Sequence, residues 1–170
     1  MRRLLLVAFA LLASLYGLYL GGYRLNVTPS LPRGIYLEAG GQPTCGDFVS
    51  FCLAGPWAQL AKERGYLAPG ACDSGLRPLL KQVAALPGDD VFMTSQGIVT
   101  VTNQDMKFWR TPLRRHDAKG RKLPESALRS GAIPQDMTLV LAEHPGSFDG
   151  RFFGLVPLAS LQRVEPIFTF

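Results

Sequence analysis

Residues 78–89 read PLLKQVAALPGD, in which an apolar run over 79–86 contains a single lysine and is closed by a Pro-Gly-Asp turn. Side chains alternate between the two faces of a strand, so Leu79, Lys81 and Val83 would share one face. The pattern therefore predicts a β-strand that carries a lysine among aliphatic side chains. Burial would lower the pKa of this lysine and let it accept a proton from a serine. The alternative is a lysine that extends to solvent from a strand edge.

The rest of the chain contains further short runs of strand-forming residues, separated by turns. The expected strands cover residues 34–38, 48–53, 79–86, 90–94, 98–102, 138–142 and 164–170, with a hairpin turn at 95–97 and a short helix at 57–64. The 13 prolines and 18 glycines argue against a helical bundle. These features predict a mainly β fold with antiparallel strands.

The N-terminus has the pattern of a membrane anchor. Arg2 and Arg3 precede an uncharged run over residues 4–22. A helix of this length reaches across most of a hydrocarbon core about 30 Å thick. The alternative is a cleaved signal peptide, but its apolar core is usually only about 7–15 residues long. We expect an uncleaved anchor over residues 1–22 and, by the positive-inside rule, a domain over residues 23–170 outside the cytoplasm.

The chain is basic, with a net charge of +5 and a pI near 9.4. No nucleic-acid-binding motif accompanies this charge, so we expect no nucleic-acid partner and favour contact with an anionic membrane surface. Residues 107–122 concentrate the positive charge in a stretch expected to be irregular. It is either a solvated loop or a contact with lipid headgroups, at about 1 kcal/mol per charge.

The three cysteines are Cys45, Cys52 and Cys72, and they form no Cys-x-x-Cys motif. Structural zinc is therefore not expected. In an oxidising compartment one pair would form a disulfide. We expect Cys52 to pair with Cys72, because these two flank one apparent insertion, although the sequence leaves the connectivity open.

Residues 28–36 read TPSLPRGIY and contain the candidate nucleophile. Prolines on both sides of Ser30 stiffen the backbone, and Gly34 permits an unusual turn. A serine held in this way suits nucleophilic catalysis. The alternative is an ordinary proline-rich turn.

A histidine-based mechanism is the competing interpretation. The chain has only His116 and His144, and His144 lies within five residues of Ser147 and Asp149. Triad members usually come from separate segments, so we do not expect a histidine triad. Two isolated histidines are too few for a metal site, and no cofactor is expected.

Three blocks occur in the order seen in type I signal peptidases, and the sequence resembles that family over nearly its whole length. They are Thr28-x-Ser30-x-Pro32, the Lys81 block that ends at Asp89, and residues 147–157, SFDGRFFGLVP. The closer resemblance is to the TraF-type branch, the maturation peptidases of conjugative transfer. It includes residues 26–36 and ERGYL at 63–67. The resemblance implies the antiparallel β peptidase fold shared by signal peptidases and LexA-like repressors, behind one N-terminal transmembrane helix.

The resemblance also implies a role for each matching residue. Ser30 matches the nucleophile and Lys81 the general base of a Ser–Lys dyad. Thr28 matches a hydroxyl that forms the oxyanion hole together with the Ser30 backbone N–H. Ser147 matches a hydroxyl that orients the lysine.

Asp149 and Arg151 match a supporting pair whose aspartate is essential in the TraF-type branch. A purely structural salt bridge is the equally weighted alternative. Family members often have serine at the position of Gly150 and asparagine at that of His144. The second difference leaves open whether His144 tunes the site.

By analogy, the chain is expected to be a serine endopeptidase, anchored in the bacterial cytoplasmic membrane by a single pass with its catalytic domain in the periplasm. It would process a pilin precursor during conjugative transfer, with or without cyclisation of the pilin. The alternatives are a general signal peptidase and a catalytically silent assembly protein, although Ser30 and Lys81 are both present. The expected partners are a pilin precursor or other exported protein, the membrane, and other transfer proteins.

Overall fold

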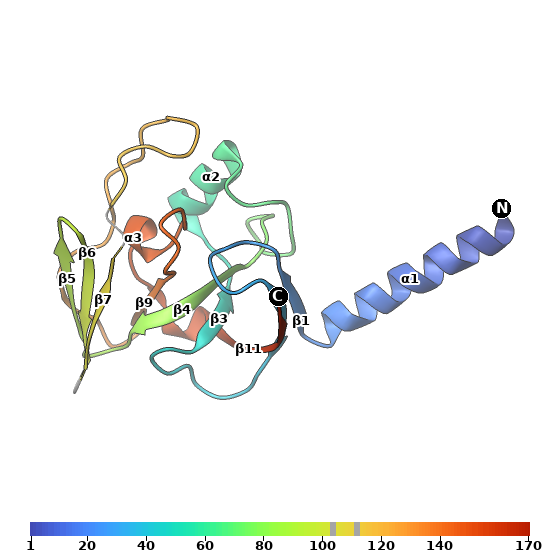
Figure 1. Cartoon of the computed structure of the whole chain (residues 1–170), viewed down its shortest axis with the longest axis horizontal. Coiled ribbons are helices and arrows are strands. Elements are labelled where there is room, and N and C mark those ends of the chain that lie inside the picture. The colour runs from blue at the N-terminus through green and yellow to red at the C-terminus, as the bar shows by residue number, and fades with distance from the viewer. Residues whose placement is uncertain (103–104, 111–112) are drawn as a thin grey trace.

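The computed structural model describes residues 1–102, 105–110 and 113–170. The elements follow one another along the chain as labelled in Figure 1. They are α1 (Arg2–Leu20), β1 (Tyr23–Asn26), β2 (Gly34–Glu38), β3 (Phe48–Phe51), α2 (Gly55–Arg64), β4 (Leu79–Ala85), β5 (Asp90–Thr94), β6 (Gly97–Val101), β7 (Met106–Trp109), β8 (Gly131–Ala132), β9 (Met137–Leu141), α3 (Gly150–Phe153), β10 (Val156–Pro157), the 3-10 helix η1 (Leu158–Ser160) and β11 (Gln162–Thr169).

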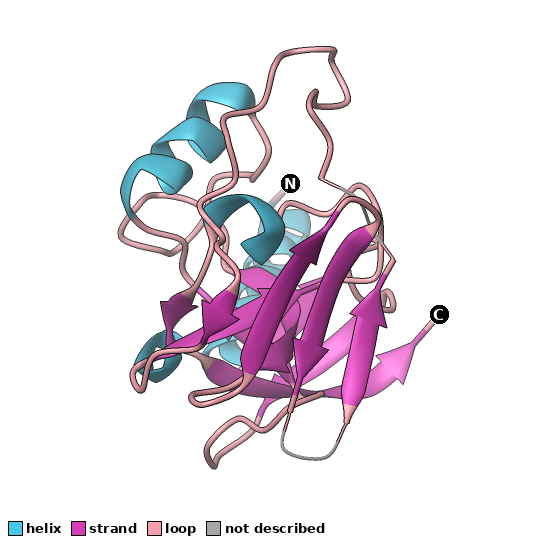
Figure 2. Cartoon of the chain, turned by 90° about the vertical axis from the view of Figure 1, so that its left-hand side faces the viewer, coloured by secondary structure: helices cyan, strands magenta, loops and turns pink. Residues whose placement is uncertain are grey.

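The described strands form two antiparallel sheets. The larger has seven strands in the order β1-β2-β11-β3-β4-β9-β10, and the smaller has four in the order β7-β6-β5-β8. Every strand pair recorded among the described residues is antiparallel. Figure 2 shows the strands of the smaller sheet in front, with a helix at the upper left of the molecule. The prediction of a mainly antiparallel β fold is confirmed.

Strand β4 has the alternation expected from its sequence. Leu79, Lys81 and Val83 are all buried, and Lys81 is only 2% exposed. The strand pairs with β3 on one side and with β9 on the other, so Lys81 does not lie on a sheet edge. Val83 packs with Val49 and Val140 of these neighbours in the main core cluster. The prediction of a lysine on a buried apolar face is therefore confirmed.

Strand β7 corrects the expectation that residues 107–122 are irregular throughout. Residues 107–109 pair with β6, and Trp109 is 3% exposed in a second core cluster with Ile98 and Leu139. The density of positive charge in this stretch gave no indication of the strand. Pairing with β6 places Trp109 in the core cluster. Residues 111–112 of the stretch lie outside the described residues.

A disulfide joins Cys52 to Cys72, as predicted, and Cys45 is free. The bond connects the two ends of the segment that contains α2. Helix α2 has a proline in its first turn, and it is capped after Arg64 by Gly65, which has the left-handed conformation (φ 66°) that glycine adopts readily.

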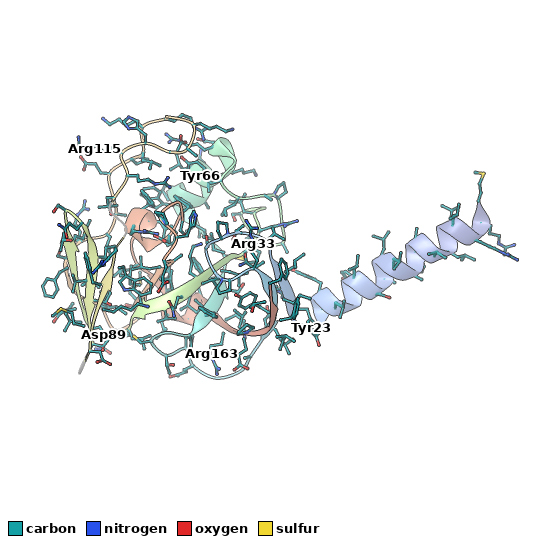
Figure 3. All side chains as sticks on the ribbon, viewed as in Figure 1. Tyr23, Arg33, Tyr66, Asp89, Arg115 and Arg163 are labelled. Carbon is teal, nitrogen blue, oxygen red and sulfur yellow. A yellow bond between two sulfur atoms is a disulfide. The ribbon has the colours of Figure 1, made fainter. Side chains whose placement is uncertain are left out.

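Helix α1 has no buried residue and extends away from the domain (Figure 1). By length and composition it is able to cross a membrane, and a signal sequence near the N-terminus would have the same properties. Tyr23 lies where α1 meets the domain (Figure 3). Arg24 connects the two parts, because it donates to the Tyr19 carbonyl at 2.8 Å and to the Glu38 carboxylate at 2.6 Å.

Candidate active site

The loop that carries Ser30 connects β1 to β2 and is held by a buried asparagine. Asn26 is 3% exposed, and its Nδ2 donates to the carbonyls of Thr28, Leu31 and Pro32, each at 3.1 Å. Its Oδ1 accepts from the Thr28 backbone N–H at 3.1 Å and from the Thr28 hydroxyl at 2.8 Å. Asn26 is a part of the site that sequence reasoning missed. The signal that could have indicated it is the residue type itself, because asparagine often bonds the backbone N–H two residues later in an Asx turn.

The loop is also supported from β2 and β11. The buried Tyr36 donates its hydroxyl to the Pro32 carbonyl at 2.6 Å. Gly34 lies against β11 so closely that an added Cβ would be 2.0 Å from the Phe168 carbonyl oxygen. No side chain fits there without a backbone shift, which explains the glycine that follows the serine loop.

Lys81 has an unusually low pKa. Its burial disfavours the ammonium form and lowers the pKa from 10.5 to about 8. The negative charge of Asp149 opposes this change, and the positive charge of Arg151 adds to it. Near neutral pH, a much larger fraction of Lys81 is therefore uncharged than of an exposed lysine.

One cleft of about 510 Å³ brings together residues that are far apart in the sequence. Ser30, Lys81, Ser147 and Thr28 all line it. The Ser30 and Ser147 hydroxyl oxygens are 3.3 Å apart, close enough for a hydrogen bond in which either hydroxyl donates. Ser147 itself is 3% exposed. The structure thus places the predicted nucleophile, base and orienting hydroxyl on the same cleft.

Asp149 and Arg151 form a buried ion pair, with side chains 0% and 1% exposed. Arg151 Nε donates to Asp149 Oδ1 at 2.8 Å. The carboxylate also accepts from the Ala142 backbone N–H at 3.1 Å, and Arg151 donates to the carbonyls of Ala142 (3.1 Å) and His144 (3.2 Å). The pair therefore fixes the turn that presents Ser147. It also acts on Lys81 through its charges.

His144 lines the cleft and makes two hydrogen bonds within the turn before Ser147. Its Nδ1 accepts the backbone N–H of Gly146 at 3.0 Å, and its carbonyl accepts that of Ser147 at 3.0 Å. The imidazole thus shapes the turn before Ser147. Over the described part of the chain, no three His, Cys, Asp or Glu side chains gather to hold a metal ion.

Part of the basic stretch forms a wall of the cleft. Arg114, Asp117 and Ala118 line it together with Tyr66 from the segment after α2. Tyr66, labelled in Figure 3, donates its hydroxyl to Asp117 at 2.7 Å, and Arg121 Nε donates to the same carboxylate at 2.7 Å. The sequence predicted a solvated loop or a lipid contact, and nothing in the local pattern indicated a wall of the cleft.

Comparisons with known proteins assign the family. The family model described as "Signal peptidase, peptidase S26" matches residues 2–165. The chain is similar to the conjugal transfer protein TraF of Agrobacterium tumefaciens (strain 15955), with 38% identity over 158 residues, 88% of this chain and 84% of the relative. It is also similar to a plasmid transfer protein TraF of Escherichia coli, with 34% identity over 155 residues, 89% of this chain and 85% of the relative.

A signal peptidase I from Enterococcus faecalis V583 is a structural neighbour, with a TM-score of 0.39 and 19% identity over 77% of this chain and all of that chain. The family match covers nearly the whole chain, and the TraF relatives exceed 30% identity over most of both lengths. The chain therefore belongs to the signal peptidase family, peptidase S26, and is a homologue of the TraF conjugal transfer proteins.

Proposed function

We propose that this chain is a membrane-anchored serine endopeptidase that processes a pilin precursor during conjugative transfer, with Ser30 as nucleophile and Lys81 as general base. The observation that carries the proposal is the presence of Ser30 and a buried Lys81, with a pKa of about 8, on one cleft. The role in conjugation rests on the similarity to TraF transfer proteins.

The lowered pKa makes Lys81 a competent base near neutral pH. With a pKa of about 8, about 10% of the lysine is neutral at pH 7, against about 0.03% at an ordinary pKa. The difference is about 300-fold in the concentration of the base. The neutral amine takes the proton of Ser30 as Oγ attacks the scissile carbonyl, and the resulting ammonium then protonates the leaving amine. Ser147, 3.3 Å from the Ser30 hydroxyl, would orient the nucleophile, and the family resemblance implies that it also orients the lysine.

The acyl group then forms an ester with Ser30, and a second nucleophile releases it. Water gives a linear product, whereas the amino terminus of the same substrate gives a cyclic one. The Ser30 backbone N–H and the Thr28 hydroxyl would stabilise the oxyanion. The Thr28 hydroxyl donates to Asn26 Oδ1 in the free protein, so it would have to exchange that acceptor for the oxyanion when substrate binds.

The substrate would bind as an added strand. β1 is the terminal strand of the larger sheet, and its end lines the cleft together with residues 77–80, which lead into and begin β4. An extended peptide between these segments would form main-chain hydrogen bonds, while the cleft selects side chains. The family resemblance implies cleavage after small residues.

The N-terminal helix and the disulfide support the location. Arg2 and Arg3 would stay in the cytoplasm, α1 would cross the membrane, and the domain would lie in the periplasm. The Cys52–Cys72 disulfide fits this oxidising compartment.

The test is co-expression of the full chain with a candidate pilin precursor, followed by the intact mass of the pilin. Wild type should shorten the pilin, and Ser30→Ala and Lys81→Ala should leave it full length while remaining folded in the membrane. The matched controls Ser160→Ala and Lys62→Ala change exposed residues and should process normally. A product one water lighter than the trimmed linear chain would indicate cyclisation. Processing by Ser30→Ala or Lys81→Ala at the wild-type rate would refute the dyad.

A general signal peptidase is the second candidate, and the description of the matched family favours it. The chemistry is the same, but many exported precursors would be substrates. Trimming of several unrelated precursors, with the pilin precursor unchanged, would decide for this alternative. A protein that processes neither class would be the silent assembly factor.

A further inference from the structure

We propose that Asn26 is the positioning residue that holds Ser30 in its reactive place, with Tyr36 as a second clamp on the same loop. The inference rests on the proposed function, because it takes Ser30 as the nucleophile. Neither residue is assigned a chemical step. Both act on the backbone of the loop that presents Ser30.

All the recorded hydrogen bonds of the Asn26 side chain go to the loop that carries Ser30. Its two N–H groups are shared among three carbonyls, those of Thr28, Leu31 and Pro32. These carbonyls lie on both sides of Ser30 in the sequence, so one side chain fixes the loop before and after the nucleophile. Asn26 is 3% exposed and its bond to the Leu31 carbonyl is buried, so water cannot readily replace that bond, and its loss would leave the Leu31 carbonyl without this donor.

Neither aspartate nor alanine reproduces this set of bonds. Aspartate has the same shape and keeps an acceptor for the Thr28 N–H and hydroxyl, but it has no donor for the three carbonyls. Alanine loses both functions. The asparagine also sets the direction of the Thr28 hydroxyl, a cleft-lining group, through the 2.8 Å bond to Oδ1.

Tyr36 strengthens the clamp from β2. Its hydroxyl donates to the Pro32 carbonyl at 2.6 Å, so this one carbonyl accepts from both clamp residues. Burial raises the pKa of Tyr36. The phenol therefore stays protonated, and remains a donor, over the alkaline range in which Lys81 becomes neutral. At the end of the loop, the Phe170 backbone N–H donates to the Arg33 carbonyl at 2.9 Å.

The experiment compares Asn26→Ala, Asn26→Asp and Tyr36→Phe with wild type as full-length proteins in detergent. Gln162→Ala is the matched control, because its amide also donates to two backbone carbonyls, those of Ala39 and Arg163, at an exposed place. The probe is a quenched-fluorescence peptide with alanine at the first and third positions before the scissile bond, the usual small-residue pattern. Hydrogen exchange of the amides in residues 27–33 is followed in parallel.

A displaced nucleophile should lower kcat and leave substrate binding intact. We expect both Asn26 variants to lose about 100-fold in kcat, with KM within about threefold of wild type, as for an active-site group displaced by about 1 Å. Tyr36→Phe should lose about fivefold, the worth of one hydrogen bond. The pH midpoint of the rate should stay near 8, because Lys81 is unchanged. Exchange of the loop amides should become faster in the Asn26 variants and stay unchanged in Gln162→Ala.

A folded Asn26 variant that keeps kcat within about threefold of wild type and normal loop exchange would overturn the proposal. Should the Asn26 variants fail to fold, Tyr36→Phe decides the question, because it keeps the buried ring and removes only the hydroxyl. Unchanged kcat and exchange in Tyr36→Phe would then overturn the clamp. Ser30→Ala is included throughout. Cleavage that persists in Ser30→Ala refutes the proposed function separately, and the exchange data still decide whether Asn26 and Tyr36 hold the loop.

Discussion

Replacement of Lys81 by methionine should abolish activity and stabilise the folded protein at neutral pH. Lys81 is 2% exposed, and its pKa is lowered from 10.5 to about 8 on folding. At pH 7 the lysine is charged in both the folded and the unfolded chain, and the folded state bears the cost of burying that charge. A shift of about 2.5 pH units corresponds to about 3 kcal/mol. Methionine has a similar length and no charge, so Lys81→Met removes this cost.

The cost of burying the charged Lys81 also makes the wild-type stability depend on pH. Between pH 8 and pH 10.5 the unfolded chain binds more protons at this position than the folded chain, so the wild-type stability rises with pH. By pH 10.5 the penalty has fallen below about 0.5 kcal/mol. The stability advantage of Lys81→Met should therefore be large at pH 7 and small at pH 10.5.

Thermal unfolding of both proteins in the same detergent, at pH 7 and at pH 10.5, measures the effect. For a domain of this size, about 3 kcal/mol at pH 7 corresponds to a rise in Tm of about 6–12 °C. Lys62→Met is the control, because Lys62 is exposed and its replacement should leave Tm nearly unchanged. Equal Tm values for wild type and Lys81→Met at pH 7, or a gap of the same size at both pH values, would refute the reasoning that burial lowers the pKa of Lys81.

Three further predictions concern the rate, the disulfide and the buried ion pair. The peptidase rate should rise about 50-fold between pH 6 and pH 8 and level off above pH 9, because Lys81 loses its proton over this range. A stopped assay at each pH measures this rise, and a flat profile counts against lysine as the base. The double variant Cys52→Ser/Cys72→Ser should lose about 3 kcal/mol of unfolding free energy, because the disulfide closes a loop with a sequence separation of 20. Denaturant titration measures this loss, and an unchanged midpoint would contradict the prediction. Asp149→Asn should lower the free energy of unfolding by about 3–5 kcal/mol, because it leaves Arg151 charged and buried without its partner. The added change Arg151→Met should restore part of this loss. Equal stability of the single and double variants would argue against a buried charge as the cause.

Several features of the fold could be predicted from the sequence because they depend on neighbouring residues. The alternation around Lys81 and the turn that follows it define β4 locally, and the strands at residues 34–38 and 90–94 agree with the structure. The apolar run after Arg2 and Arg3 predicts α1, whose length follows from composition alone. The pairing of Cys52 with Cys72 was also predicted, but only as the more plausible of several connectivities.

Other elements form only through pairing with distant residues. β1 and β7 have weak local patterns, and they are strands because β2 and β6 offer them partners. The wall of the cleft depends on the bond from Tyr66 to Asp117, 51 residues away. Local periodicity contains no information about such contacts, so residues 107–122 could only be interpreted as a basic stretch.

The same division applies to the candidate site. The sequence by itself determined which residues could react, because Ser30 between two prolines and Lys81 in an apolar run are patterns of residue type and spacing. Only the tertiary structure decided that they share a cleft, that Ser147, 117 positions from Ser30, lies 3.3 Å from its hydroxyl, and that Asn26 holds the loop. The physical reason is that a pKa and a hydrogen bond depend on burial and on distances in space, and the folded chain sets both by packing segments that are remote along the sequence.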